Sequence, residues 1–173
     1  AVTARTRAII VNSPHNPTGR LFGAEDFGEL TRTAVENDLV VISDEVYEHM
    51  VYDGAGHTSL LTIDALRDRS IVVSSFGKTC HATGWKVAYA IASPHLTEEF
   101  RKVHQFVTFT THTPTQWALA EFLDKHPEHY LNLPDFYQAK RDRFNASLAD
   151  SAFTITPSAG TYFQLAGYAS IAD

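Results

Sequence analysis

A chain of 173 residues with 44% hydrophobic and 20% charged residues is large enough for one globular core, or for a domain and part of another, and its composition excludes a disordered protein. The net charge of −6, without a basic stripe, argues against nucleic acid as a partner, and no apolar run is long enough to span a bilayer. The single cysteine, Cys80, cannot form an internal disulfide, which predicts a reducing, cytoplasmic location.

The chain begins at Ala1 and reaches a strand pattern within a few residues, so we expect it to be an internal piece of a longer protein. Residues 7–11, 39–42 and 70–73 are short apolar runs rich in β-branched side chains, which predicts three buried strands. Apolar side chains at helical spacing predict a helix over residues 21–38. The resulting strand–helix–strand order is typical of an α/β fold.

Each of these runs ends in a cluster of small polar or ionisable residues, at positions 12–16, 43–47 and 74–78. Parallel neighbouring strands bring their carboxyl ends to one edge of the sheet, where open α/β sheets carry their chemistry. A carboxylate, a phenol, an amide, a hydroxyl and a lysine are therefore expected to converge. The set lacks both the glycine-rich turn of a dinucleotide site and a P-loop.

A fourth apolar run, residues 87–92, follows the third after a short connection without a helical pattern. A parallel neighbour needs a crossover of about a dozen residues, so this strand is expected to be antiparallel to the third. The spacing then predicts helices over residues 96–107, 115–124 and 136–148, the last with its basic residues, Arg141 and Arg143, facing outward.

Two strands, residues 152–156 and 160–165, are predicted at the end of the chain. We expect a first domain over residues 1–128, part of a large α/β domain with a mixed, mostly parallel sheet. Residues 129–173 would form a linking helix and the start of a small α+β domain.

Lys78 follows Gly77 at the predicted end of the third strand. A lysine at this position could act as a nucleophilic amine, because the neighbouring glycine lets the backbone approach a bound cofactor closely. Ser75 and Lys86 would suit a phosphate group. The alternative interpretation of this stretch is an ordinary strand-to-loop turn with two solvated lysines.

Four short motifs in this order resemble the successive signatures of the fold type I pyridoxal-phosphate aminotransferases, in particular the branch with methionine and kynurenine aminotransferases. The motifs are Asn16-Pro17-Thr18-Gly19, Asp44-Glu45-Val46-Tyr47, Ser75-Phe76-Gly77-Lys78-Thr79 and Thr83-Gly84-Trp85-Lys86. Each motif alone is weak, but the order and spacing together are specific. The resemblance continues to Gly160-Thr161-Tyr162-Phe163 and covers nearly the whole chain.

The resemblance implies pyridoxal 5'-phosphate as cofactor and a role for each motif residue. Lys78 would hold the cofactor as an imine and then move the substrate proton, and Asp44 would keep the pyridine nitrogen protonated. Tyr47 and Asn16 would hydrogen-bond the ring oxygen. Structural alternatives are a helix cap for Asp44, a core aromatic for Tyr47 and a turn residue for Asn16.

For the phosphate, the resemblance implies Ser75 and Lys86, where many relatives carry arginine. A lysine is a point charge without the bidentate fork of arginine. No metal site is expected, because His126 and His129 lie in a polar stretch that reads as solvated surface, and no convincing ligand spacing is present.

The implied reaction is amino-group transfer between an amino acid and a 2-oxo acid in a homodimer. Methionine, aromatic amino acids and kynurenine remain open as substrates, because we expect the family's carboxylate-binding arginine to lie outside this chain. The alternatives are a pyridoxal-phosphate carbon–sulfur β-lyase and a non-catalytic, aminotransferase-like regulatory domain. We expect this segment by itself to be inactive.

Overall fold

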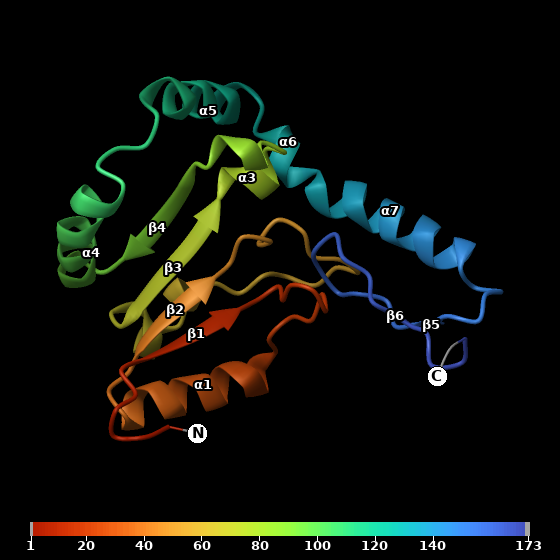
Figure 1. The fold of residues 1–173 in the computed structure, drawn as a ribbon, viewed down its shortest axis with the longest axis horizontal. Coiled ribbons are helices and arrows are strands. Elements are labelled where there is room, and N and C mark those ends of the chain that lie inside the picture. Colours follow the sequence, from red (N-terminus) through yellow and green to blue (C-terminus); the bar gives the residue numbers. More distant parts are fainter. Residues whose placement is uncertain (1, 172–173) are drawn as a thin grey trace.

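The computed structural model describes residues 2–171, and its centre is a mixed sheet of four strands in the order β1-β2-β3-β4 (Figure 1). The strands are β1 (Ala8–Asn12), β2 (Val40–Asp44), β3 (Ser70–Ser75) and β4 (Ala88–Ala92). The first three are parallel, and β4 runs antiparallel to β3. The α/β fold, the three parallel strands and the antiparallel fourth strand are thus confirmed.

Helices and short turns lie between the strands of the four-stranded sheet and follow the last of them. They are α1 (Ala24–Glu36), α2 (Asp64–Arg67), α3 (Phe76–Thr79), α4 (Pro94–Val107), α5 (Thr113–Lys125), α6 (Glu128–Leu131) and α7 (Leu133–Ser147), with the 3-10 turns η1 (Leu60–Thr62) and η2 (Thr83–Trp85). The long helices lie within a few residues of their predicted bounds. Lys78 lies in the one-turn helix α3, where the sequence predicted only a polar loop.

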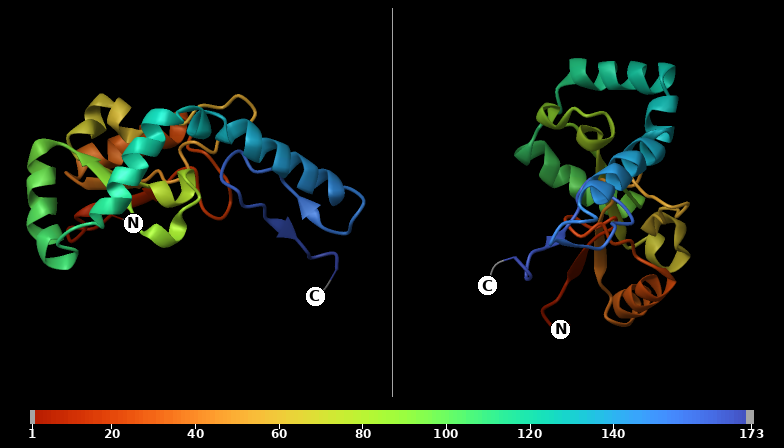
Figure 2. Two further views of the ribbon diagram at one scale, coloured as in Figure 1. Left: turned by 90° about the horizontal axis from the view of Figure 1, so that it is seen from above. Right: turned by 90° about the vertical axis from the view of Figure 1, so that its right-hand side faces the viewer.

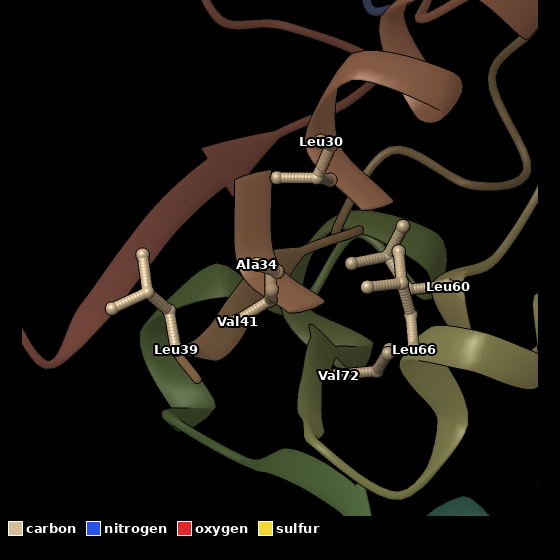
Figure 3. Close-up of a cluster of buried hydrophobic side chains, with 7 residues drawn as sticks. All are labelled: Leu30, Ala34, Leu39, Val41, Leu60, Leu66 and Val72. Atoms are coloured by element: carbon tan, nitrogen blue, oxygen red, sulfur yellow. The ribbon is translucent and has the colours of Figure 1, made fainter. Parts of the chain in front are cut away.

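The apolar core lies between one face of the sheet and the helices α1 and α2 (Figure 3). It consists of Leu30, Ala34, Leu39, Val41, Leu60, Leu66 and Val72. Side chains alternate between the faces of a strand, so Ile9 and Val11 pack against this core while Ile10 points to the opposite face and is 75% exposed. Burying these side chains fixes the register in which the strand ends line up.

The carboxyl-terminal part differs from the prediction. Strands β5 (Thr154–Ile155) and β6 (Ala166–Gly167) form a two-residue ladder, and Figures 1 and 2 show them beside α7, which extends away from the sheet. Residues 160–165 do not form the predicted strand. The strand preference of its threonine and aromatic residues is overridden by packing, since Gly160 makes only an isolated bridge to Val51 and Thr161 has a positive φ of 66°.

Within residues 2–171, no helix combines the length and the apolarity that crossing a bilayer requires.

Candidate active site

A cavity of about 620 Å³ lies at the carboxyl ends of β1, β2 and β3. Five of the six predicted site residues line it: Asn16, Asp44, Tyr47, Ser75 and Lys78. They lie at or just after the carboxyl ends of three neighbouring parallel strands. The convergence that the strand ends predicted is therefore present in the structure.

Asp44 is the last residue of β2, and its position is set by the parallel ladder. It is the register partner of Asn12 on one side and of Val73 on the other. Its carboxylate Oδ1 accepts a hydrogen bond from the backbone N–H of Val46 at 3.2 Å, so the side chain also caps the turn that follows. A turn rather than a helix follows Asp44, so the predicted helix cap is a turn cap instead, and this role is compatible with the functional interpretation.

Tyr47 is buried and still lines the cavity. Its ring packs edge-on against Tyr162 and Phe163, with centroids 5.4 and 5.8 Å apart. Burial, the interaction with Tyr162 and the charge of Asp44 raise the pKa of the Tyr47 phenol well above its usual value. Tyr47 is thus a core aromatic that carries a protonated hydroxyl at neutral pH.

Lys78 is half-buried in α3, and its amine lies 5.8 Å from the centroid of the Tyr162 ring. Close packing favours the glycine before it, since a Cβ on Gly77 would lie 3.0 Å from the Cα of Thr83, a tight contact. The neighbour that favours glycine is therefore the backbone of the next turn. This reason differs from the cofactor approach that the sequence suggested.

Lys86 does not line this cavity. It is exposed, with a positive φ of 54°, at the end of η2. It lies two residues before Ala88, which is the register partner of Ser75 in the β3–β4 ladder. Ser75 and Lys86, the two residues predicted to bind the phosphate, therefore lie near the same end of that ladder, but only Ser75 lines the cavity.

A second polar network adjoins the cavity and was not predicted. The buried carboxylate of Glu45 accepts hydrogen bonds from Ser43 Oγ and the N–H of Leu60, and lies 2.8 Å from Nε2 of His57. Burial alone would raise the pKa of Glu45, but hydrogen bonds from His57, Leu60 and Ser59 lower it on balance. His57 lies in a loop far from Glu45 in sequence, so no local pattern signals the pair.

Glu48 extends this network to the cavity wall. Its Oε1 accepts hydrogen bonds from Ser74 Oγ at 2.7 Å and from the Tyr89 hydroxyl at 2.6 Å, and Ser74 lines the cavity. Burial and the bond to Glu48 raise the pKa of Tyr89 to about 12.

Atoms of Glu45, Glu48 and His57 that could bind a metal lie within 4.8 Å of one another. Hydrogen-bond donors occupy both carboxylates, so we interpret the cluster as a structural network.

His126 and His129, both predicted to lie on the solvated surface, differ in their exposure. His126 is exposed, as expected, but His129 is half-buried and its Nε2 lies 2.8 Å from the carbonyl oxygen of Thr79. Helix α6, which carries His129, folds back onto α3, next to Lys78. The polar local sequence does not indicate this contact.

Arg141 was also misplaced by the sequence pattern. Its side chain is only 8% exposed and is paired with Asp53, although the helix pattern put it on the outer face. Arg143, on the same helix, is exposed as predicted.

Known aminotransferases match this chain over nearly its whole length. The family model Aminotransferase class I and II matches residues 1–172. The chain is 48% identical to methionine aminotransferase of Escherichia coli over 98% of this chain and 44% of that protein. It is 36% identical to kynurenine–oxoglutarate transaminase of Dictyostelium discoideum over 99% of this chain and 40% of that protein.

Solved structures give the same result. The structure of an Escherichia coli protein with a methionine aminotransferase function matches with a TM-score of 0.95 and 47% identity, over 99% of this chain and 45% of that chain. N-succinyldiaminopimelate aminotransferase of Mycobacterium tuberculosis matches with a TM-score of 0.89 and 41% identity, over 94% of this chain and 42% of that chain. The chain thus spans less than half the length of these relatives.

Proposed function

The chain belongs to the aminotransferase class I and II family, and we propose that the whole protein uses pyridoxal 5'-phosphate to transfer an amino group between an amino acid and a 2-oxo acid. One observation carries the proposal. An amine, a carboxylate, a phenol, an amide and a hydroxyl line a single cavity, and they come from three segments aligned by a parallel sheet.

The residues present fit this cofactor. A cavity of about 620 Å³ is within the usual size of a small-molecule site, roughly 300–1,000 Å³. Its polar groups match those of the cofactor, since the aldehyde requires an amine, the ring nitrogen an acid and the ring oxygen a hydrogen-bond donor. When bound, the cofactor supplies an electron sink for the charge that forms on the substrate α-carbon.

In this proposal Lys78 attaches the cofactor through its amine and afterwards carries the proton at the substrate α-carbon. Asp44 holds the proton on the ring nitrogen, because its carboxylate favours a positive charge nearby. Tyr47 donates a hydrogen bond to the ring oxygen, consistent with its raised pKa, and Asn16 donates through its side-chain amide.

Ser75 and Lys86 are proposed to bind the phosphate. Ser75 offers a hydroxyl in the cavity wall, and Lys86 lies beside the same end of the β3–β4 ladder. Its side chain is exposed. It would act as a single positive charge.

The substrate is proposed to have a large side chain, as methionine, aromatic amino acids and kynurenine do. Two observations support this. One is the names of the relatives, and the other is that the rings of Tyr162 and Phe163 lie next to Tyr47, with Tyr137 beyond Tyr162. The names of the relatives also favour transamination over a β-lyase or a regulatory domain.

We further propose a cytoplasmic homodimer. The single cysteine suits a reducing compartment. Apolar side chains at the end of α4 and just after it are largely exposed, with Phe106 84% and Phe109 81% accessible, and a second copy would cover them. The division into a large domain over residues 1–128 and a linking helix with a small domain over 129–173 remains part of this proposal.

Borohydride reduction of the full-length protein with pyridoxal phosphate, followed by peptide mapping, tests the assignment. The expected product carries the pyridoxyl group on Lys78, and the Lys78→Arg variant carries none. A label on Lys86 would contradict the assignment of the amine. Absence of saturable conversion of methionine, aromatic amino acids or kynurenine with a 2-oxo acid would contradict the proposed reaction.

A further inference from the structure

Building on this proposed function, we propose that Asn12 is a positioning residue that fixes Asn16 and Asp44 relative to each other across the cavity. Asn12 is the last residue of β1 and itself lines the cavity. It lies between the two residues assigned to the ring oxygen and the ring nitrogen of the cofactor.

The side-chain amide of Asn12 makes one hydrogen bond to each of these residues. Its Nδ2 donates to the carbonyl oxygen of Asp44 at 2.9 Å, and its Oδ1 accepts from the backbone N–H of Asn16 at 2.8 Å. Asn12 and Asp44 are also register partners in the parallel ladder. One planar group thus joins the end of β2 to the loop after β1.

Only an amide can make both bonds at this length. The bond to Asp44 needs a donor and the bond to Asn16 needs an acceptor, and the side chain of asparagine carries one of each in a fixed plane. An aspartate would keep the acceptor and lose the donor. An alanine would lose both.

Other hydrogen bonds also shape the loop after β1: the N–H of Ser13 donates to the carbonyl oxygen of Asp44, and the N–H of His15 donates to the carbonyl oxygen of Arg20. Pro14 and Pro17 carry no N–H, so they cannot donate hydrogen bonds to the sheet. Asn16 is exposed, and in the part of the chain that the structure describes its backbone N–H bonds only to Asn12. The bond from Asn12 is thus the one that holds the Asn16 backbone itself, while the other bonds hold its neighbours.

The consequence for the site is a fixed distance between Asn16 and Asp44. Asn16 and Asp44 are assigned to different positions of one rigid ring, so an error in their separation weakens the contact of at least one of them. Misplacement by about 1 Å can cost two orders of magnitude in rate. Asn12 would set this spacing without contacting the reacting atoms.

The experiment uses the full-length protein with the variants Asn12→Ala and Asn12→Asp. Asn37→Ala is the matched control, because Asn37 also donates its amide to a backbone carbonyl, that of Thr33, but at the end of α1. Two quantities are measured: amide hydrogen exchange at Asn16 without cofactor, and the Kd of pyridoxal phosphate from its absorbance. The melting temperature of each variant reports simple loss of stability.

We expect Asn12→Ala to speed exchange at Asn16 and to raise the cofactor Kd by about tenfold, because a displaced Asn16 weakens its hydrogen bond to the ring oxygen. Asn12→Asp should keep exchange at Asn16 slow, since the carboxylate still accepts, and should still raise the Kd. Asn37→Ala should change neither quantity. If Asn12→Ala does not fold, Asn12→Asp alone decides between these outcomes through the same two measurements.

A double-mutant cycle separates positioning from general stability. In the Asn16→Ala background, Asn12→Ala should raise the cofactor Kd by clearly less than tenfold, because part of its effect passes through Asn16. An undiminished effect there, or a Kd and exchange rate equal to those of Asn37→Ala, would overturn the proposal. Failure of the wild-type protein to bind the cofactor would instead contradict the proposed function, while the exchange at Asn16 would still test the Asn12 bond.

Discussion

Arg141 donates two hydrogen bonds to the carboxylate of Asp53, at 2.6 and 2.8 Å, and a third to the carbonyl oxygen of Ser158 at 2.8 Å. Its guanidinium also lies over the ring of Tyr52, 4.9 Å from the centroid. These bonds with Asp53 raise the pKa of Arg141 further above its usual value. Helix α7 is thereby tied to the loop after β2 and to the segment before β6.

Arg141→Ala should lower the free energy of unfolding of the full-length protein by about 1–3 kcal/mol, because it removes the packing of the arginine stem and leaves the Ser158 carbonyl without this donor. Arg143→Ala, on the same helix but exposed, should change it by less than about 0.5 kcal/mol. Urea denaturation of both variants compares them directly. Equal effects would mean that the Arg141 contacts add nothing to stability.

Much of the fold could be predicted because it depends on local patterns. The strands β1, β2 and β3 are β-branched apolar runs, and the short connection before β4 left only the antiparallel arrangement. The segment 160–165 was predicted wrongly because its threonine, tyrosine and phenylalanine residues favour strands. In the structure the rings of Tyr162 and Phe163 pack against Tyr47 instead, and this tertiary contact decides the backbone.

The site could be predicted in part for a similar reason. Asp44, Ser75 and Lys78 follow buried strands, and parallel strands bring such ends together. The supporting contacts could not be predicted, since each joins residues far apart in sequence. His57 approaches Glu45 and His129 approaches Thr79 through loops and turns whose paths only the folded chain defines.

Acid should destabilise the protein through Glu45. Its pKa is lowered in the folded state from an ordinary value of 4.5, so its contribution to stability is complete above about pH 4.5 and is lost as the pH falls through the lower folded value. Unfolding free energies measured from pH 7 to pH 3 should show this loss. In Glu45→Gln, which cannot ionise, the slope below pH 4.5 should be smaller.

The exposed Glu29, paired with Arg32 on α1, provides the control. Glu29→Gln should leave the acid slope close to that of the wild type, because exposed ion pairs contribute little. An acid slope in Glu45→Gln as steep as in the wild type would assign the acid sensitivity to other groups.

Gly77→Ala should destabilise the protein and weaken cofactor binding. The added Cβ would lie 3.0 Å from the Cα of Thr83 and 3.3 Å from Ser75 Oγ, and the backbone there is held by the bond from Thr83 Oγ1 to the Gly77 carbonyl. Relieving this overlap moves α3 and with it Lys78, at a cost of about 1–3 kcal/mol. Thermal unfolding and a pyridoxal-phosphate titration measure the two effects.

Gly28→Ala is the matched control for this substitution. Gly28 lies in the middle of α1, with nothing within 4 Å of the added Cβ, so alanine should stabilise the helix by about 0.5–1 kcal/mol. A Gly77→Ala variant that gained stability in the same way would show that the Thr83 backbone yields without cost.

Asp44 offers a test that separates chemistry from folding. Its carboxylate accepts only one backbone hydrogen bond among the described residues, from Val46, and an asparagine Oδ1 can accept the same bond. Asp44→Asn should therefore keep the fold and the capped turn. It removes the negative charge that the proposed function requires next to the ring nitrogen.

We expect Asp44→Asn to lower kcat by about a hundredfold or more, because an amide cannot stabilise the positive ring nitrogen as charge moves into the cofactor, while the melting temperature stays near that of the wild type. Cofactor binding should weaken less than turnover, since the lysine, hydroxyl and phosphate contacts remain. Asp124→Asn, on the exposed surface of α5, should leave kcat and cofactor binding unchanged.

Single-turnover kinetics of Asp44→Asn with α-deuterated substrate would place the loss of rate in the proton-transfer step, where the isotope effect should grow. Near-normal turnover in Asp44→Asn would leave the residue with only its structural role in the turn.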